Sequence, residues 1–189
     1  MRIFTGTSGW SYKSWRGEFY PRDLRSEGFL GYYATRLAAV EVNNTFYRMP
    51  KSAVLESWAA AVPEGFRFVL KISRRVSHFK RLKGCEELME FILGNAALLG
   101  DRLGPLLLQL PPDFEADLPL LRGFLRELPR GFRVAFEPRH RSWFCGGLVT
   151  LFAELNAEVP RVGFCGGGRL PDAASDDLAD ASAVGYLRL

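Results

Sequence analysis

The stretch VAFEPRHRSW, from Val134 to Trp143, decides how the rest of the chain is interpreted. It opens with three apolar residues, as a strand buried on both faces does, and four charged or imidazole side chains follow almost at once. A strand that only supports a fold usually ends in glycine, asparagine or aspartate and turns. A buried strand that runs into charge indicates a site at its carboxyl end, where parallel barrels place theirs.

Short apolar segments alternate with segments of helical spacing along the chain. The predicted strands are Arg2–Gly9, Ala39–Tyr47, Phe66–Ile72, Pro105–Pro112, Phe132–Arg139, Arg161–Gly168 and Val184–Leu189. The predicted helices are Gly28–Ala38, Ser52–Val62 with Ser52 as N-cap, Cys85–Gly104, Asp117–Leu128 and Gly147–Ala157. Repeated βα units predict an α/β fold with a parallel sheet covered by helices, either doubly wound or closed into a barrel. The weakly patterned segment Arg169–Ser182 is a loop or a poor helix, and no linker divides the chain.

Composition sets broad limits on function. The chain has 189 residues with a net charge of +4 and a pI near 9.1, which permits an anionic partner without requiring one. Three cysteines without a C-x-x-C pair argue against a disulfide framework or a structural zinc and indicate reduced thiols in a cytoplasmic protein. We predict no signal peptide and no membrane partner, since no run reaches the ~18 apolar residues of a spanning helix.

Polar side chains gather at the predicted carboxyl ends of the strands. Because side chains alternate along a strand, residues of the same parity share a face. The residues on the site face are Thr5 and Thr7; Glu41, Asn43 and Thr45; Lys71; Gln109; Glu137 and Arg139; and Arg188. Charged groups there are costly unless they are paired or used, so the set predicts a polar pocket. Its predicted apolar walls are Trp10, Phe46, Tyr47 and Trp143.

Several of these segments together resemble the YecE-like proteins, the family called domain of unknown function 72. The matching segments are Gly6–Pro21, Val40–Pro50, Phe66–Gly84, Leu103–Phe114 and Arg133–Trp143. The resemblance implies a TIM-like (β/α) barrel with parallel strands and outer helices, a single domain over residues 1–189, in a family without an established activity. In that family a His-Gly pair, further helices and an eighth strand follow the strand that matches Tyr186–Leu189. We therefore expect a barrel that lacks its last βα unit or units, with bare strand edges that favour a homo-oligomer.

Metal chemistry is the first alternative to weigh. The chain has only two histidines, His78 and His140, too few for a multi-zinc site. A single Mg²⁺ between Glu41 and Glu137 is less favoured than pairing of these carboxylates with arginines. We predict no metal site and leave the cofactor unknown.

The favoured interpretation is a basic-rimmed pocket that binds or processes a phosphate-containing small molecule or a nucleic acid. The basic residues that follow the strands are Arg48, Lys71, Arg74, Arg75, His78, Lys80, Arg81, Arg139, His140 and Arg141. In catalysis Glu137 would be the general base, His140 an acid or base, and Lys71 and Arg139 charge stabilisers, with Glu41 as a further catalytic candidate. The predicted ligand-binding residues are Trp10, Asn43, Tyr47, Arg48, His78, Gln109, Arg139 and Trp143.

Two other classes stay open, and with them the question of whether the protein is an enzyme. A glycoside- or sugar-processing enzyme would use Glu41 and Glu137 as its two carboxylates, which must lie within about 5–9.5 Å of each other. A non-catalytic binding scaffold would need neither. The glycines of Cys165–Gly168 would suit a phosphate cradle, although a flexible loop explains them more simply.

Overall fold

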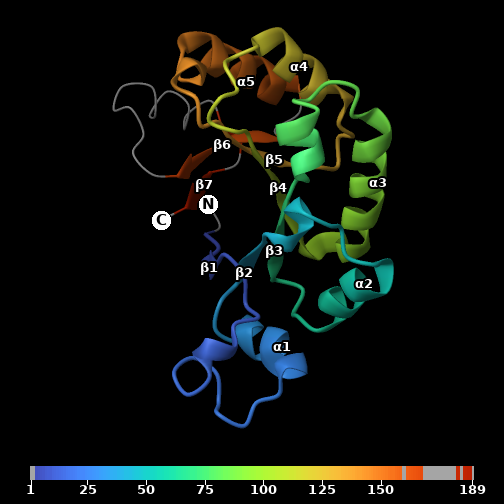
Figure 1. Cartoon of the computed structure of the whole chain (residues 1–189), viewed down its shortest axis with the longest axis vertical. Helices are drawn as coiled ribbons and strands as arrows, with labels where there is room; N and C mark the ends of the chain where they lie inside the picture. The colour runs from blue at the N-terminus through green and yellow to red at the C-terminus, as the bar shows by residue number, and fades with distance from the viewer. Residues whose placement is uncertain (1–2, 159–160, 168–181, 184, 189) are drawn as a thin grey trace. The chain divides into compact units, whose positions relative to one another are not determined.

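Figure 1 shows the computed structural model of the chain, which describes residues 3–158, 161–167, 182–183 and 185–188. The chain forms two compact units. The first unit contains Met1–Lys71 and Phe91–Gly104, and the second contains Ile72–Glu90 and Pro105–Leu189. Along the chain, α3 (Glu86–Ala96) passes from the second unit into the first.

The first unit is built on three parallel strands, β1 (Gly6–Thr7), β2 (Ala39–Val42) and β3 (Arg67–Lys71), paired in chain order. The connecting helices are α1 (Phe29–Ala34) and α2 (Ser52–Ala60). Gly6 lies opposite Ala39, and a Cβ atom at Gly6 would stand 2.0 Å from the Ala39 carbonyl oxygen, so only glycine fits there. The hydroxyl of Tyr33 donates to the same carbonyl at 2.8 Å and ties α1 to the sheet.

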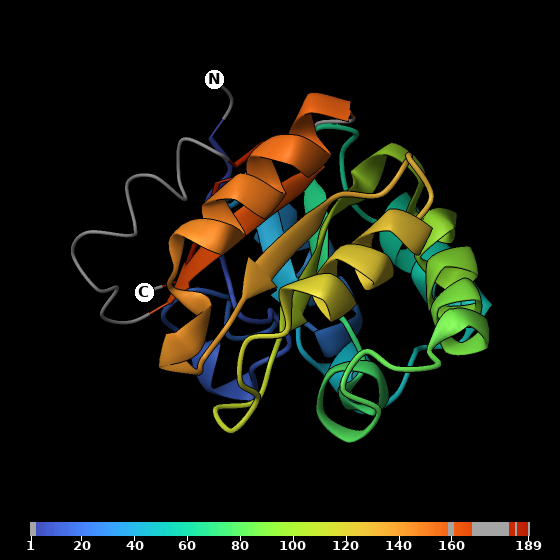
Figure 2. The ribbon, with the colours of Figure 1, turned by 90° about the horizontal axis from the view of Figure 1, so that it is seen from above.

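The second unit repeats the arrangement with β4 (Leu103–Gln109), which belongs to this unit from Pro105 onward, and with β5 (Val134–Glu137), β6 (Val162–Gly167) and β7 (Tyr186–Arg188), again parallel and in chain order. Figure 2 shows α4 (Leu118–Glu127) and α5 (Gly146–Glu158) side by side over β4–β6. Their apolar faces are buried, and Phe136 of β5 meets Phe152 of α5 edge to face at 6.0 Å. This burial is the main stabilising contribution of the layer.

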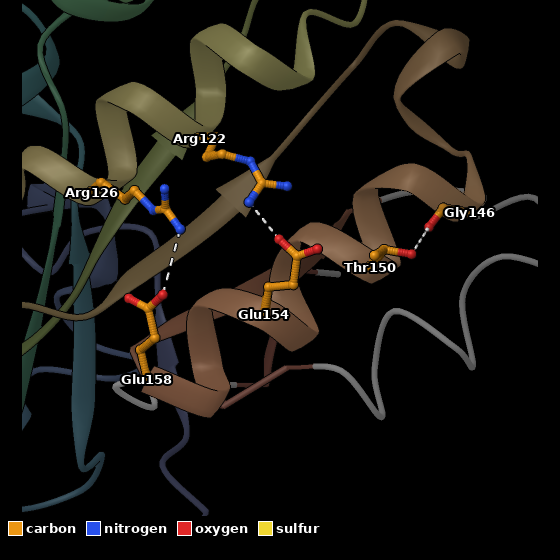
Figure 3. A network of polar contacts seen from close by, with 6 residues as sticks. All are labelled: Arg122, Arg126, Gly146, Thr150, Glu154 and Glu158. Carbon is orange, nitrogen blue, oxygen red and sulfur yellow. Dashed lines mark hydrogen bonds and ion pairs between the residues drawn. The ribbon is translucent and has the colours of Figure 1, made fainter.

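Ion pairs join α4 and α5 on their outer side (Figure 3). Arg122 pairs with Glu154, and Arg126 pairs with Glu158 at 3.4 Å. All four side chains are exposed to solvent, so each pair contributes at most about 1 kcal/mol. The buried apolar faces, rather than these pairs, therefore hold the helices in place.

Short helical turns complete both units. They are η1 (Lys13–Trp15), η2 (Ser26–Gly28), η3 (Asn44–Phe46), the π-helical η4 (Arg75–Phe79), η5 (Ala97–Arg102) and η6 (Arg141–Trp143). Two of them correct the sequence predictions. The predicted strand Ala39–Tyr47 ends at Val42 because η3 follows it. The predicted helix Cys85–Gly104 ends at Ala96, since η5 contains Gly100 at φ 54° and ψ −137°, which no α-helix accommodates.

Two smaller predictions also change. The N-cap of α2 is Lys51, and the predicted cap Ser52 is already the first helical residue. Of the predicted first strand Arg2–Gly9, the described residues pair only over Gly6–Thr7. In the weakly patterned segment only Ser182 is described, and Gly168 of the glycine run also lies outside the described residues.

The parallel α/β architecture predicted from the sequence is confirmed in both units. In the part of the chain that the structure describes, we find no helix with the length and apolar character needed to span a bilayer.

Candidate functional site

The carboxyl end of β5 holds a buried carboxylate. Glu137 is the last residue of β5 and lies opposite Gln109, the last residue of β4. Both side chains are about 5% exposed, and Gln109 Nε2 donates to Glu137 Oε1 at 2.7 Å. A buried carboxylate is costly unless donors surround it, so this bond stabilises the charged form in place.

Two further donors reach the same carboxylate. Arg139 Nε and Nη2 both lie 3.4 Å from Glu137 Oε1, and Cys165 Sγ of β6 lies 3.8 Å from Glu137 Oε2. The Arg139 side chain is 49% exposed, whereas that of Glu137 is almost fully buried. Glu137 therefore acts as an inner anchor that orients an arginine whose outer side faces solvent.

One ring nitrogen of His140, Nδ1, is hydrogen-bonded to a neighbouring residue of the protein. Its Nδ1 accepts from the Ser142 backbone N–H at 3.3 Å and lies 2.8 Å from Ser142 Oγ. Because Nδ1 accepts from this N–H, it carries no proton, so the Ser142 hydroxyl donates to it while accepting from the Ala116 N–H at 2.8 Å. A neutral His140 then carries its proton on Nε2, which makes Nε2–H a donor.

Trp143 does not lie where the sequence prediction put it. The side chain is fully buried, and its indole N–H donates to the Phe114 carbonyl oxygen at 2.7 Å. Its ring packs edge to face against Phe114 and Phe136. Trp143 is a core residue of the second unit, so its ring offers no exposed face on which a ligand could stack.

The basic segment Ser73–Gly84, which we name the basic loop, has an unusual backbone. Its first half is the π-helical η4, a type of turn that occurs frequently at functional sites. Arg81 and Leu82 follow with φ values of 48° and 66°, in the left-handed region. Each such residue costs roughly 1–3 kcal/mol, so the rest of the structure must hold this conformation.

Contacts on both sides anchor the basic loop. Leu82 is buried, and Arg81 pairs with Asp113 and lies 5.4 Å over the ring of Phe114. The hydrogen bond from Arg81 holds the pKa of the Asp113 carboxyl below its usual value. His78 Nδ1 lies 2.8 Å from the hydroxyl of the buried Ser77. The loop is thus a defined surface.

An open depression of about 400 Å³ lies beside this loop. Its lining includes Arg81 and Lys83 of the loop, and Asp113, Phe114 and Asp117 between β4 and α4. Asp117 is engaged as the N-cap of α4, accepting from the Leu120 N–H at 3.0 Å. The depression therefore presents mixed charge, which favours no single ligand class.

The first unit holds the other predicted residues. Glu41 is buried at the end of β2 and accepts from Asn43 Nδ2 at 2.8 Å. Lys71 Nζ lies 4.6 Å over the ring of Phe46. Tyr47 is 64% exposed.

The remaining predicted residues of this unit, Arg48 and Trp10, differ in exposure. Arg48 is exposed, and Trp10 is half-buried against Trp58 at 5.0 Å and Phe68 at 6.4 Å. Ring contacts of this kind are typical of a supporting cluster, although Trp10 is still partly exposed.

The structure thus brings Gln109, Glu137 and Arg139 together in one unit, and Glu41 with Asn43 in the other. Cys165 is the member of the carboxylate cluster that sequence reasoning missed, because the cysteines were interpreted only as reduced thiols without a site role. The signal that could have revealed it is the register of β5 and β6. Phe136 pairs with Phe164, so the next residues on these adjacent strands are Glu137 and Cys165. Glu41 and Glu137 belong to different units, so their role as a carboxylate pair stays a prediction.

Among the residues that the structure describes, no three His, Cys, Asp or Glu side chains gather in a way that could hold a metal ion. The donors around Glu137 are an amide, a guanidinium and a thiol, a set suited to a carboxylate rather than to a cation.

Comparison with known proteins identifies relatives. A family model described as "Protein of unknown function DUF72" matches residues 4–176. The UPF0759 protein YecE of Escherichia coli K12 is 34% identical over 146 residues, which cover 77% of this chain and 51% of that protein. The protein of the same name from Escherichia coli O157:H7 matches equally. The chain thus spans about half the length of these curated relatives.

Solved structures show the same fold. A DUF72 family protein from Thermotoga maritima MSB8 aligns with a TM-score of 0.68 at 23% identity, covering 97% of this chain and 90% of that one. A DUF72 family protein from Enterococcus faecalis V583 aligns with a TM-score of 0.66 at 22% identity, covering 87% of this chain and 60% of that one. At these identities the likeness concerns the fold alone.

Proposed function

The chain belongs to the protein family of unknown function DUF72, and within it we propose that the carboxyl end of β5 binds a phosphate-containing ligand. The ligand class is a nucleotide, a phosphosugar or the backbone of a nucleic acid. The observation that carries the proposal is the half-exposed Arg139 held by the buried Glu137. The family's name assigns no activity, and the chemistry of this chain's own residues supports the ligand class.

Arg139 has the properties of an anion-binding side chain. A guanidinium offers five N–H donors in a planar fork that matches two oxygens of a phosphate group. Glu137 engages Nε and Nη2 from the inner side, which reduces the rotational freedom that binding would otherwise remove. The next residue, His140, adds Nε2–H as a second donor, and Arg141 adds positive charge. Together these residues favour an oxyanion over a neutral sugar.

The same residues support an acid–base assignment. In this proposal Glu137 accepts a proton from the ligand, the imidazolium form of His140 donates one from Nε2 and becomes neutral, and Arg139 stabilises developing negative charge. Gln109 orients the carboxylate through its 2.7 Å bond and acts as a positioning residue. Lys71 and Glu41 of the first unit keep their predicted catalytic roles within this proposal, with Asn43, Tyr47, Arg48, Trp10 and His78 as ligand contacts.

We also infer that the parallel strands of both units belong to one TIM-like barrel domain, and that the protein works in the cytoplasm. The parallel order with intervening helices supports the barrel. The cysteines are free, which is typical of a reducing compartment. An experimental structure with a flat, open sheet, or recovery of the protein from the periplasm, would contradict these inferences.

A thermal-shift experiment tests the binding site. The chain is screened against nucleotides, phosphosugars and neutral oligosaccharides at low and high salt, as wild type, Arg139→Ala and Arg130→Ala. Arg130 is a matched control, because it is an exposed arginine just before β5 rather than after it. A ligand at 100 times its Kd stabilises the fold by about 2.7 kcal/mol, which raises Tm by roughly 5–10 °C.

We expect anionic ligands to raise Tm in the wild type and in Arg130→Ala, less at high salt, and not in Arg139→Ala. A shift by anionic ligands that persists in Arg139→Ala would contradict the site. A shift by neutral oligosaccharides alone would favour the sugar-processing alternative. Turnover of a bound ligand that is unchanged in Glu137→Gln would remove the acid–base assignment while leaving the binding proposal intact.

A further inference from the structure

Phe79, the last residue of η4, is the phenylalanine of the basic loop, and 68% of its surface is open to solvent. The exposure does not come from a loose chain. Val76 and Leu82 on either side are buried, and the Leu82 N–H donates to the Val76 carbonyl oxygen at 3.0 Å. The Lys80 N–H donates to the Arg75 carbonyl oxygen at 3.0 Å. The backbone thus holds an apolar ring out in water.

The ring lies in a strongly basic environment. The basic loop contains five Lys or Arg residues and no Asp or Glu. The guanidinium of Arg74 lies 5.3 Å over the ring of Phe79, while Arg75 and Lys80 are exposed. One face of the ring therefore carries a cation, and exposed basic residues lie close to it in sequence.

Another exposed phenylalanine shows what is particular about this one. Phe91 of α3 is 57% exposed, but it follows Glu90 directly and lies one helical turn from Glu87. An apolar ring among carboxylates repels a polyanion, whereas the same ring among guanidinium and ammonium groups attracts one. Exposure alone does not distinguish the two residues, but the charge around them does.

We propose that Phe79 is a base-stacking platform for single-stranded nucleic acid, with Arg74, Arg75 and Lys80 contacting the phosphates on either side of the stacked base. Stacking on an aromatic ring requires a base face that a duplex keeps covered, so the partner is single-stranded. This inference narrows the ligands of the proposed function to single-stranded nucleic acid. It rests on the proposed function in one respect, namely that the protein recognises phosphate groups. The residues that carry it differ from Glu137 and Arg139.

Fluorescence anisotropy tests the platform directly. Labelled oligothymidylate and oligouridylate of about 20 nucleotides are titrated with the full chain, next to an abasic strand of equal length and a duplex. The variants are Phe79→Ala, Phe79→Trp and, as a matched control, Phe91→Ala. We expect Phe79→Ala to weaken binding of both single strands by about 10-fold, and Phe79→Trp and Phe91→Ala to leave it unchanged.

Binding of the abasic strand should be equal in all variants, because it uses phosphate contacts alone. An equal loss on the abasic strand, an equal loss in Phe91→Ala, or duplex binding as tight as single-strand binding would overturn the platform. If Phe79→Ala weakens binding of only the ribose strand or only the deoxyribose strand, the affected strand identifies which nucleic acid is the partner. Absence of single-strand binding by the wild type would also overturn it, whereas an Arg139-dependent thermal shift with nucleotides would show that the proposed function stands.

Discussion

The carboxyl ends of β5 and β2 share one sequence pattern, a polar position at the end of an apolar strand, but their buried carboxylates are held by different contacts. Both strands end beside a buried glutamate, Glu137 on β5 and Glu41 on β2. Besides Arg139 of its own segment, Glu137 receives donors from both neighbouring strands, Gln109 on one side and Cys165 on the other. Glu41 receives an amide from Asn43, two residues further along its own chain.

The register explains the difference. Gln109 is the partner of Glu137 in the sheet, whereas the partner of Glu41 is the apolar Val69. The carboxylate on β5 is therefore held by tertiary structure, and the carboxylate on β2 gains its described donor from a local turn. Four tests, in order of decreasing expected effect, can break or sharpen this comparison.

The largest effect is expected for the aromatic residues that follow the two strands. Trp143→Ala should lower the free energy of unfolding by about 3–5 kcal/mol, because it removes a fully buried ring and leaves the Phe114 carbonyl without its donor. Phe46→Ala at the half-buried turn after β2 should cost about 1 kcal/mol or less. Urea denaturation measures both. Equal losses would mean that the two strand ends are packed alike.

The second prediction concerns the donors themselves. Gln109→Leu keeps the volume of the side chain but removes the 2.7 Å bond to the buried Glu137, so it should cost about 1.5–3 kcal/mol. Asn43→Leu removes the corresponding bond to Glu41 at a half-buried position, where water can replace it, and should cost less than about 1 kcal/mol. Chemical unfolding at pH 7 gives both values. A larger loss in Asn43→Leu would reverse the comparison.

A third variant tests why β2 stops at Val42. The Thr45 hydroxyl lies 2.8 Å from the carbonyl oxygens of Val42 and Lys71, so Thr45→Val should cost about 1 kcal/mol and Thr45→Ser should restore most of it. Thr150→Val is the matched control. Its hydroxyl donates to the Gly146 carbonyl oxygen at 3.1 Å on the exposed side of α5 (Figure 3), where water can take its place. An equal cost at both sites would show that the hydroxyl does not hold the turn.

The smallest effect is expected at the surface pair of the basic loop. Arg81 lowers the pKa of Asp113, so the pair stabilises the fold above the ordinary aspartate pKa of about 3.9, and this contribution disappears as pH falls through the lowered value. Asp113→Asn should therefore reduce Tm slightly at pH 7 and match the wild type at strongly acid pH. Scanning calorimetry across pH measures the difference. A constant difference at all pH values would show that packing, rather than charge, links Arg81 to Asp113.

Local pattern predicted much of this molecule. The strand–helix alternation, the parallel architecture and the end of β5 as a polar position all follow from periodicity and composition, because each depends on neighbours in sequence. The turn after Val42 was missed because Asn43 and Thr45 continue the alternation of a strand, although Thr45 directs its hydroxyl to backbone carbonyls. The break at Gly100 was missed because a glycine inside a helical pattern does not reveal its φ angle.

By itself, the sequence determined the α/β class, the family and the gathering of polar residues where strands end. Only the tertiary structure decided which of those residues meet. It placed Gln109 and Cys165 on Glu137, removed Trp143 from any binding surface, and set Phe79 in water among cations. The physical reason is that periodicity is a local property of the chain, whereas burial and register depend on strands that lie many residues away in sequence.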